Sequence, residues 1–209
     1  MRYLAATGPL PFVYCARSFL ELAECRRLAD EMDDGRLCAA PLREAGRGDV
    51  VAQHRRRAEH LVDSSATQTL VADRLTAITD EIAGYFGIPL SGPQPPAFLR
   101  YARGGYFRPH QDRSDDPRHG LDIRARRITA VLFLNDQTPL PIVGGYCGGD
   151  LRLLRADDHP DPVLCITGEA GMLVAFPAAI AHEVRPVTWG VRRVAAAWYE
   201  DGLRAGRAA

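Results

Sequence analysis

The sequence predicts a mainly β fold, a sandwich or barrel buttressed by helices, and three observations lead to this prediction. Amphipathic helical patterns occur before Pro96, and short runs of β-branched, aromatic and aliphatic residues follow it. Gly, Pro and Asp separate these runs without intervening helical patterns, as in antiparallel β proteins. A chain of 209 residues is long enough for one sizeable core. We therefore expect a single domain over residues 1–209.

The first half of the chain predicts two helices. Apolar residues recur at three- and four-residue steps over residues 21–33, and again from about residue 66 to residue 86. Between them, residues 34–63 mix glycine, proline and charge without a period, and the proline-rich residues 91–96 indicate a linker or turn. We expect residues 1–95 to form a helical buttress and a lid region.

The second half predicts seven strands, which lie at Ala97–Tyr101, Arg127–Leu134, Asp150–Leu154, Pro162–Thr167, Gly171–Phe176, His182–Val187 and Arg192–Tyr199. Residues 96–201 are thus expected to form the β domain that carries the chemistry. Residues 202–209 are expected to form a tail.

The composition argues against several classes of partner. Lys+Arg and Asp+Glu both count 26, so the net charge of zero indicates neither a nucleic-acid nor a membrane partner. No stretch approaches the length needed to span a bilayer. The basic cluster at residues 54–57 is interpreted as a solvated face, in preference to a patch that contacts substrate. No feature of the sequence indicates an oligomeric state.

The five cysteines are odd in number and include no CxxC pair. The start of the chain is a poor signal peptide, because Gly8, Pro9 and Pro11 interrupt its apolar stretch. We expect a cytoplasmic protein with reduced cysteines.

Three residues have the spacing and chemistry of a metal site. His110 and Asp112 are two residues apart, so on an extended backbone both side chains point to one face. His182, which opens a predicted strand, is the best candidate for a third ligand. Two imidazoles and one carboxylate form the facial triad of non-haem Fe(II) oxygenases, which leaves the opposite face open. His119 and His159 are expected to be exposed loop residues. His54 and His60 lack a carboxylate partner at strand spacing.

Two arginines compete as the partner of an anionic cosubstrate. Arg192 and Arg193 follow His182 by about ten residues in the next predicted strand. A guanidinium there would form a bidentate pair with a carboxylate in a site of low dielectric. Strand alternation puts the two arginines on opposite faces, and small residues follow each of them. The pattern alone does not choose, and either arginine is equally suited to a surface ion pair.

Four ordered blocks follow one another: FLRYARGGYFRPHQD at 98–112, RRITAVLFLND at 126–136, GGDL at 148–151 and HEVRPVTWGVRRVAAAWYED at 182–201. They lie within residues 98–201, roughly half of the chain, and they resemble the prolyl 4-hydroxylase branch of the 2-oxoglutarate- and Fe(II)-dependent oxygenases. FLELAEC at 19–25 also resembles this branch's first helix. The resemblance implies a double-stranded β-helix, a jelly-roll or cupin-like barrel, buttressed by two or more helices.

The resemblance also implies roles for individual residues. It selects Arg192 as the anchor of 2-oxoglutarate and places Thr129 beside the same carboxylate. Tyr101 is expected at the cosubstrate wall. Trp198 would share Arg192's face near the pocket, or be a core aromatic. The implied iron ligands are His110, Asp112 and His182.

Phe133 departs from the resemblance. Hypoxia-factor relatives carry a tyrosine at this position, whose hydroxyl reaches the distal carboxylate, and phenylalanine has no such donor. Thr129 and Phe133 lie four residues apart on a strand, so we expect both to face the pocket. Loss of one neutral hydrogen bond costs about 1 kcal/mol, which weakens cosubstrate binding without abolishing it.

The implied reaction couples oxidative decarboxylation of 2-oxoglutarate to hydroxylation of an unactivated C–H, with release of succinate and CO2. Fe(II), 2-oxoglutarate and O2 are the implied cofactors and cosubstrates, and ascorbate is a further candidate. Halogenating relatives leave the carboxylate position empty, whereas Asp112 fills it here. Hydroxylation is therefore expected first, with desaturation or cyclisation as alternatives.

The substrate is predicted to be a small molecule or a peptide. The resemblance points to a prolyl residue or a related amino-acid moiety. A free amino acid or a natural-product scaffold is the alternative, and a non-catalytic metal-binding β-barrel module is an alternative of another class. We expect three loops to cover the barrel mouth: residues 34–63, 113–126 and 137–146. Four arginines there favour a substrate with a carboxylate, unless they are merely solvated: Arg113, Arg118, Arg124 and Arg126.

Overall fold

The computed structural model describes residues 12–155 and 162–202. His159 and residues 203–209 of the expected tail lie outside them. The helices are α1 (Leu22–Asp34), α2 (Ala66–Ala77), α3 (Thr79–Phe86) and α4 (Leu121–Ala125). The strands are β1 (Tyr14–Ala16), β2 (Leu37–Ala39), β3 (Leu42–Glu44), β4 (Gly48–Val50), β5 (Arg56–Arg57), β6 (Glu59–Leu61), β7 (Leu90–Pro93), β8 (Ala97–Tyr101), β9 (Tyr106–His110), β10 (Arg126–Phe133), β11 (Tyr146–Gly148), β12 (Leu151–Leu153), β13 (Leu164–Ile166), β14 (Leu173–Pro177), β15 (His182–Val184), β16 (Val187–Gly190) and β17 (Arg192–Asp201).

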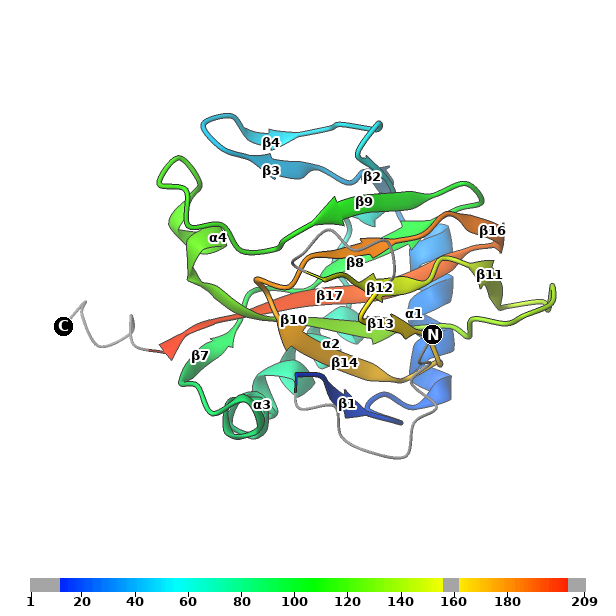
Figure 1. Ribbon diagram of the computed structural model, residues 1–209. Coiled ribbons are helices and arrows are strands. Elements are labelled where there is room, and N and C mark those ends of the chain that lie inside the picture. The colour runs from blue at the N-terminus through cyan, green and yellow to red at the C-terminus, as the bar shows by residue number, and fades with distance from the viewer. Residues whose placement is uncertain (1–11, 156–161, 203–209) are drawn as a thin grey trace.

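Two antiparallel sheets form the body of the protein (Figure 1). The larger sheet has the order β1-β14-β10-β17-β8-β6-β2, with β7 added beside β17. The smaller sheet has the order β13-β12-β15-β9-β5. Two further two-stranded sheets, the β3-β4 hairpin and the pair β11-β16, are separate from these sheets. The mainly β fold with N-terminal helices is thus confirmed, but the described strands form separate sheets and no closed barrel.

Strand alternation divides the core into two apolar clusters. On β10, Ile128, Ala130 and Leu132 belong to the cluster that also contains buried residues of α1, α2 and α3. Val131 and Phe133, on the other face, pack with residues of the smaller sheet. Both faces of the larger sheet are therefore buried. Helices cover one face, and the smaller sheet covers the other.

Several boundaries differ from the prediction. The long helix expected over residues 66–86 is broken at Ile78, where the Thr79 hydroxyl donates to the Thr76 carbonyl at 2.7 Å. The expected linker at residues 91–96 overlaps β7, which pairs with β17 at the edge of the larger sheet. Residues 34–63, which have no clear period, form five short strands. Their length of two or three residues is too short to show alternation.

The five cysteines are all free. No helix within the described residues is long and apolar enough to cross a bilayer. The cytoplasmic location stays a prediction.

Candidate active site

The three predicted ligands come together where two neighbouring inner strands of the smaller sheet, β9 and β15, end and begin. His110 ends β9 and His182 begins β15, and the two residues are paired directly across the strands. Asp112 lies two residues beyond β9, where its backbone N–H donates to the Ala178 carbonyl at 3.1 Å. One ligand atom of each of the three side chains lies within 4.8 Å of the others. Within residues 12–155 and 162–202, this is the single cluster of His, Cys, Asp and Glu that could hold a metal.

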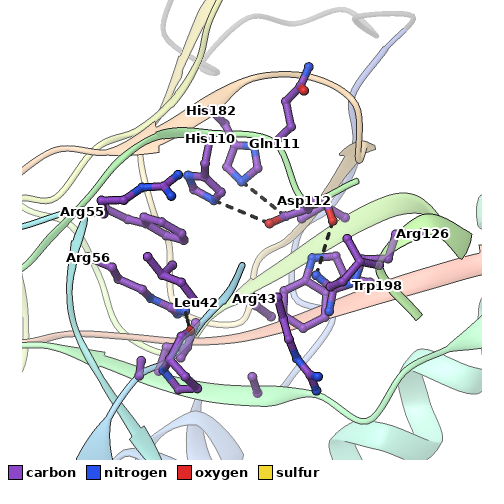
Figure 2. Close-up of a pocket in the computed structure, with 18 of the residues that line it drawn as sticks. Leu42, Arg43, Arg55, Arg56, His110, Gln111, Asp112, Arg126, His182 and Trp198 are labelled. Carbon is purple, nitrogen blue, oxygen red and sulfur yellow. Dashed lines mark hydrogen bonds and ion pairs between the residues drawn. The ribbon is translucent and has the colours of Figure 1, made fainter. Parts of the chain in front are cut away.

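Backbone carbonyls fix the orientation of both imidazoles. Nδ1 of His110 lies 2.8 Å from the Arg108 carbonyl, and Nδ1 of His182 lies 2.9 Å from the Ile180 carbonyl. A nitrogen facing a carbonyl must carry the proton, so Nε2 of each ring has its lone pair free. The two Nε2 atoms lie 3.5 and 3.3 Å from the Asp112 carboxylate (Figure 2). These donors therefore fit a divalent metal of the iron type.

Without a metal, the electrostatics of the cluster favour an ionised Asp112 and a neutral His110, which are two of the three protonation states that a metal requires. Burial lowers the pKa of His110, and the neighbouring His182 lowers it further. Burial opposes ionisation of Asp112, yet the two imidazoles hold its pKa well below the ordinary value. Burial would also lower the pKa of His182, but the Asp112 carboxylate raises it. Asp112 is thus ionised, and the His110 imidazole is neutral near pH 7.

A cavity of about 870 Å³ opens in front of the cluster, between the two sheets. Phe107, His110 and His182 line it from the smaller sheet. The larger sheet contributes a set of inward-facing side chains: Leu99, Tyr101, Thr129, Val131, Arg192, Val194, Ala196 and Trp198. A metal on the cluster would therefore face a space large enough for small ligands.

Arg192 is the charged residue buried most deeply in this cavity. Its exposed fraction is 1%, and its Cζ lies 5.2 Å from the Tyr101 ring centroid and 5.3 Å from that of Phe133. It has no ion pair among the described residues, and its Nε has no hydrogen-bond partner. Arg193 points to the opposite face and pairs with Asp33 of α1. The register of β17 thus gives the cavity a buried cation without an anion.

The other predicted site residues lie around the same cavity, but not all of them line it. Tyr101 lines the wall beneath the Arg192 guanidinium. The Thr129 hydroxyl donates to Asp112 Oδ2 at 2.8 Å, so it orients the predicted iron ligand, and its contact with the cosubstrate stays a prediction. Phe133 is buried behind Arg192 and is absent from the cavity lining. Trp198 lines the cavity and stacks under Arg126.

Tyr146 is a residue that the sequence patterns did not single out. Its hydroxyl is buried beside the Arg192 guanidinium and has no other hydrogen-bond partner among the described residues. Burial raises its pKa to about 12, although the Arg192 cation opposes this shift. A Cβ atom at Gly168 would lie 2.4 Å from both this hydroxyl and the Phe133 ring, which places the two side chains together. Only the fold brings Tyr146, Phe133 and Arg192 into one group.

Two of the three predicted mouth loops line the cavity. Residues from 34–63 and from 113–126 contribute to it, whereas no residue of 137–146 does. That third loop leads into β11, at the end of the sheets away from α4 (Figure 1). Arg55 is exposed, as the solvated interpretation of residues 54–57 predicts, whereas Arg56 is half-buried, and both line the cavity. His60 and His119 also line it, so His119 is not the exposed loop residue that was expected.

Comparison with known proteins gives the family. The family described as the 2OG-Fe(II) oxygenase superfamily matches residues 96–200. The chain belongs to this superfamily. A PKHD-type hydroxylase of Paraburkholderia xenovorans is 30% identical over 88% of this chain and 74% of its own. The chain is thus an Fe(II)- and 2-oxoglutarate-dependent hydroxylase, which uses O2.

Solved structures show the same fold. A prolyl-4-hydroxylase of Pseudomonas putida superposes with a TM-score of 0.66 at 24% identity, over 90% of this chain and 92% of that chain. HygX of Streptomyces hygroscopicus, solved with nickel, 2-oxoglutarate and hygromycin B, gives 0.60 at 16% identity, over 90% and 82%.

Proposed function

We propose that this oxygenase hydroxylates an unactivated C–H of a prolyl residue or a related amino-acid moiety. In this proposal His110, Asp112 and His182 hold Fe(II), and Arg192 binds the distal carboxylate of 2-oxoglutarate. One observation carries it. Arg192 is a buried cation without an anion, and it lines the same cavity as the metal ligands. A buried guanidinium is costly unless a carboxylate pairs with it, and 2-oxoglutarate supplies that carboxylate.

The residues divide the work of the reaction between them. Fe(II) held by His110, Asp112 and His182 would supply the O2 chemistry that couples decarboxylation of 2-oxoglutarate to oxidation of the substrate C–H. Arg192 and Tyr101 hold the cosubstrate at the inner end. Thr129 keeps the Asp112 carboxylate turned toward the metal. The residues that remain for the substrate are those of the outer half of the cavity, where the β3-β4 hairpin forms the proposed lid (Figure 1).

The substrate class rests on the relatives. The P. xenovorans relative is a PKHD-type hydroxylase, and a prolyl-4-hydroxylase shares the fold. A coupled assay tests the proposal by measuring succinate and hydroxylated product with free proline and with proline-containing peptides, with and without ascorbate. We expect succinate and hydroxylated product in equal amounts with one of these groups. Turnover confined to an aromatic or sugar scaffold would refute the prolyl class and favour a natural-product substrate.

We infer that Tyr146 supplies the hydroxyl that Phe133 lacks. Apart from the adjacent Arg192, its buried hydroxyl has no partner among the described residues, so it is available to the distal carboxylate and to the guanidinium that holds it. Tyr146→Phe should weaken 2-oxoglutarate binding by about 1 kcal/mol, or several-fold. Calorimetric titration of the Mn(II)-loaded protein would measure this without turnover.

Phe133→Tyr is the matched change. It adds a donor beside Arg192, so we expect a folded protein with equal or modestly tighter 2-oxoglutarate binding, and partial rescue of Tyr146→Phe in the double variant. The same titration and a thermal unfolding curve measure both effects. A severe loss of folding would show that the edge of the Phe133 ring meets packed core, with no room for a hydroxyl.

A further inference from the structure

Two arginines at the outer half of the cavity lack a carboxylate partner. Besides Arg192, six arginines line the cavity, and four of them have a carboxylate within 4 Å: Arg43 with Asp49, Arg55 with Glu44, Arg113 with Asp115 and Arg118 with Asp116. The other two, Arg56 and Arg126, have no ion pair in the part of the chain that the structure describes. Arg124, which the sequence grouped with Arg126, does not line the cavity.

Aromatic rings hold both guanidinium groups beside the metal ligands. The Arg56 Cζ lies 4.7 Å from the centroid of Phe107, and this ring stacks on His110 at 3.4 Å. The Arg126 Cζ lies 3.8 Å from the centroid of Trp198, and its Nη1 donates to the Asp112 backbone carbonyl at 3.4 Å. Figure 2 shows Arg56 and Arg126 on opposite sides of the ligand cluster. The Phe107 ring therefore separates Arg56 from the ligand His110, whereas Arg126 contacts the backbone of the ligand Asp112 directly.

Both guanidinium groups keep donors for a further partner. Arg56 donates from Nη1 to the Pro41 carbonyl at 3.2 Å, and its buried Nε has no partner. Arg126 uses Nε on Gln94 at 3.0 Å, and Nη1 on the Asp112 carbonyl. Arg126 is half-buried, and keeping a cation out of water is costly. An anion in the cavity would offset that cost.

Cofactor and cosubstrate do not supply this anion. In the proposed site, the Asp112 carboxylate and the two carboxylates of 2-oxoglutarate balance the charges of Fe(II) and Arg192. The inner half is then neutral. Arg56 and Arg126 remain in the outer half as two cations without a carboxylate in ion-pair contact among the described residues, and Asp122 and Glu200 act on Arg126 only from a greater distance. The substrate is the molecule that enters this half.

We propose that Arg56 and Arg126 form an anion subsite that holds a carboxylate of the substrate beside the metal. The proposal rests on the proposed function and narrows its substrate. A carboxylate held there lies few bonds from the oxidised carbon, as in a free amino acid or the C-terminal residue of a peptide. A residue in the interior of a chain offers a neutral amide at that place.

Matched pairs of probes test this subsite on the protein loaded with Mn(II) and saturating 2-oxoglutarate. The pairs are L-proline and L-prolinamide, glycyl-L-proline and its amide, and the same free and amidated forms of leucine and glutamine. Paramagnetic broadening of the probe's NMR signals by Mn(II) reports binding near the metal without turnover. The free and dipeptide pairs distinguish an amino acid from a peptide C-terminus.

We expect the carboxylate form of at least one pair to bind about tenfold more tightly than the amide form. The carboxylate accepts two charge-assisted hydrogen bonds from the arginines, which the neutral amide cannot replace. Arg56→Gln and Arg126→Gln should each remove most of this preference. Arg118→Gln is the control, since it removes a cavity arginine that Asp116 already pairs, and it should change binding by about twofold or less.

Equal binding of acid and amide in every pair would overturn the anion subsite. So would a carboxylate preference that survives in the Arg56→Gln, Arg126→Gln double variant. Failure of the wild-type protein to bind 2-oxoglutarate with Mn(II) would instead refute the proposed function. Titration of 2-oxoglutarate, done first on every variant, separates these two outcomes and shows that each variant is folded.

Discussion

Alanine at His110, Asp112 or His182 should each remove most of the bound Fe(II). Every one of these side chains contributes a donor atom, and the three donors lie within 4.8 Å of one another. Loss of an outer hydrogen-bond partner of a ligand costs roughly 10- to 100-fold in metal affinity, so loss of the ligand itself should cost more. Anaerobic equilibrium dialysis, followed by metal analysis, would measure the remaining occupancy.

His60→Ala and His119→Ala are the matched controls for these variants. Both histidines line the same cavity, but neither belongs to the ligand cluster. They should keep wild-type iron content. Wild-type occupancy in any two of the three ligand variants would contradict the assignment of the metal site.

Arg192→Ala should raise the dissociation constant of 2-oxoglutarate by roughly two to three orders of magnitude. Removing one partner of a buried ion pair costs about 3–5 kcal/mol, because it leaves the other charge unpaired, and each 1.4 kcal/mol corresponds to a factor of about ten. Arg192→Lys keeps the charge but loses the planar fork of the guanidinium. Its dissociation constant for 2-oxoglutarate should therefore lie between those of the wild type and Arg192→Ala. Calorimetric titration of the Mn(II)-loaded variants would measure these effects.

Arg193→Ala is the control for the register of β17. Its guanidinium pairs with Asp33 of α1 on the opposite face of the strand. Its loss should leave 2-oxoglutarate binding unchanged and cost at most about 1 kcal/mol of folding stability. The reverse ranking of the two arginines would show that the strand register is shifted by one residue.

The arginine choice shows what strand alternation can and cannot predict. Alternation correctly places Arg192 and Arg193 on opposite faces, but the residues that follow both are small and apolar. These small residues are buried on both faces of the larger sheet, because helices cover one face and the smaller sheet covers the other. A sheet covered on both sides has no polar face to mark the outside. The resemblance in sequence, and not the pattern, selected Arg192.

The helix break and Tyr146 were hidden for different reasons. The apolar stripe of Leu75, Ile78 and Ile82 continues through the break, since all three pack on the same core. The inferred role of Tyr146 depends on its position beside Arg192 and Phe133, and both residues are distant from it in sequence. By contrast, His110 and Asp112 were predictable, because two residues at this spacing point to the same face of an extended backbone.

A crystal structure of the protein with Fe(II) and 2-oxoglutarate, prepared without oxygen, would show both the iron ligands and the anchor of 2-oxoglutarate. We predict iron bound to Nε2 of His110, Nε2 of His182 and the Asp112 carboxylate. We also predict the distal carboxylate of 2-oxoglutarate within hydrogen-bond distance of the Arg192 guanidinium. Iron at other residues, or a distal carboxylate held by Arg56 or Arg126 with Arg192 still unpaired, would contradict these assignments.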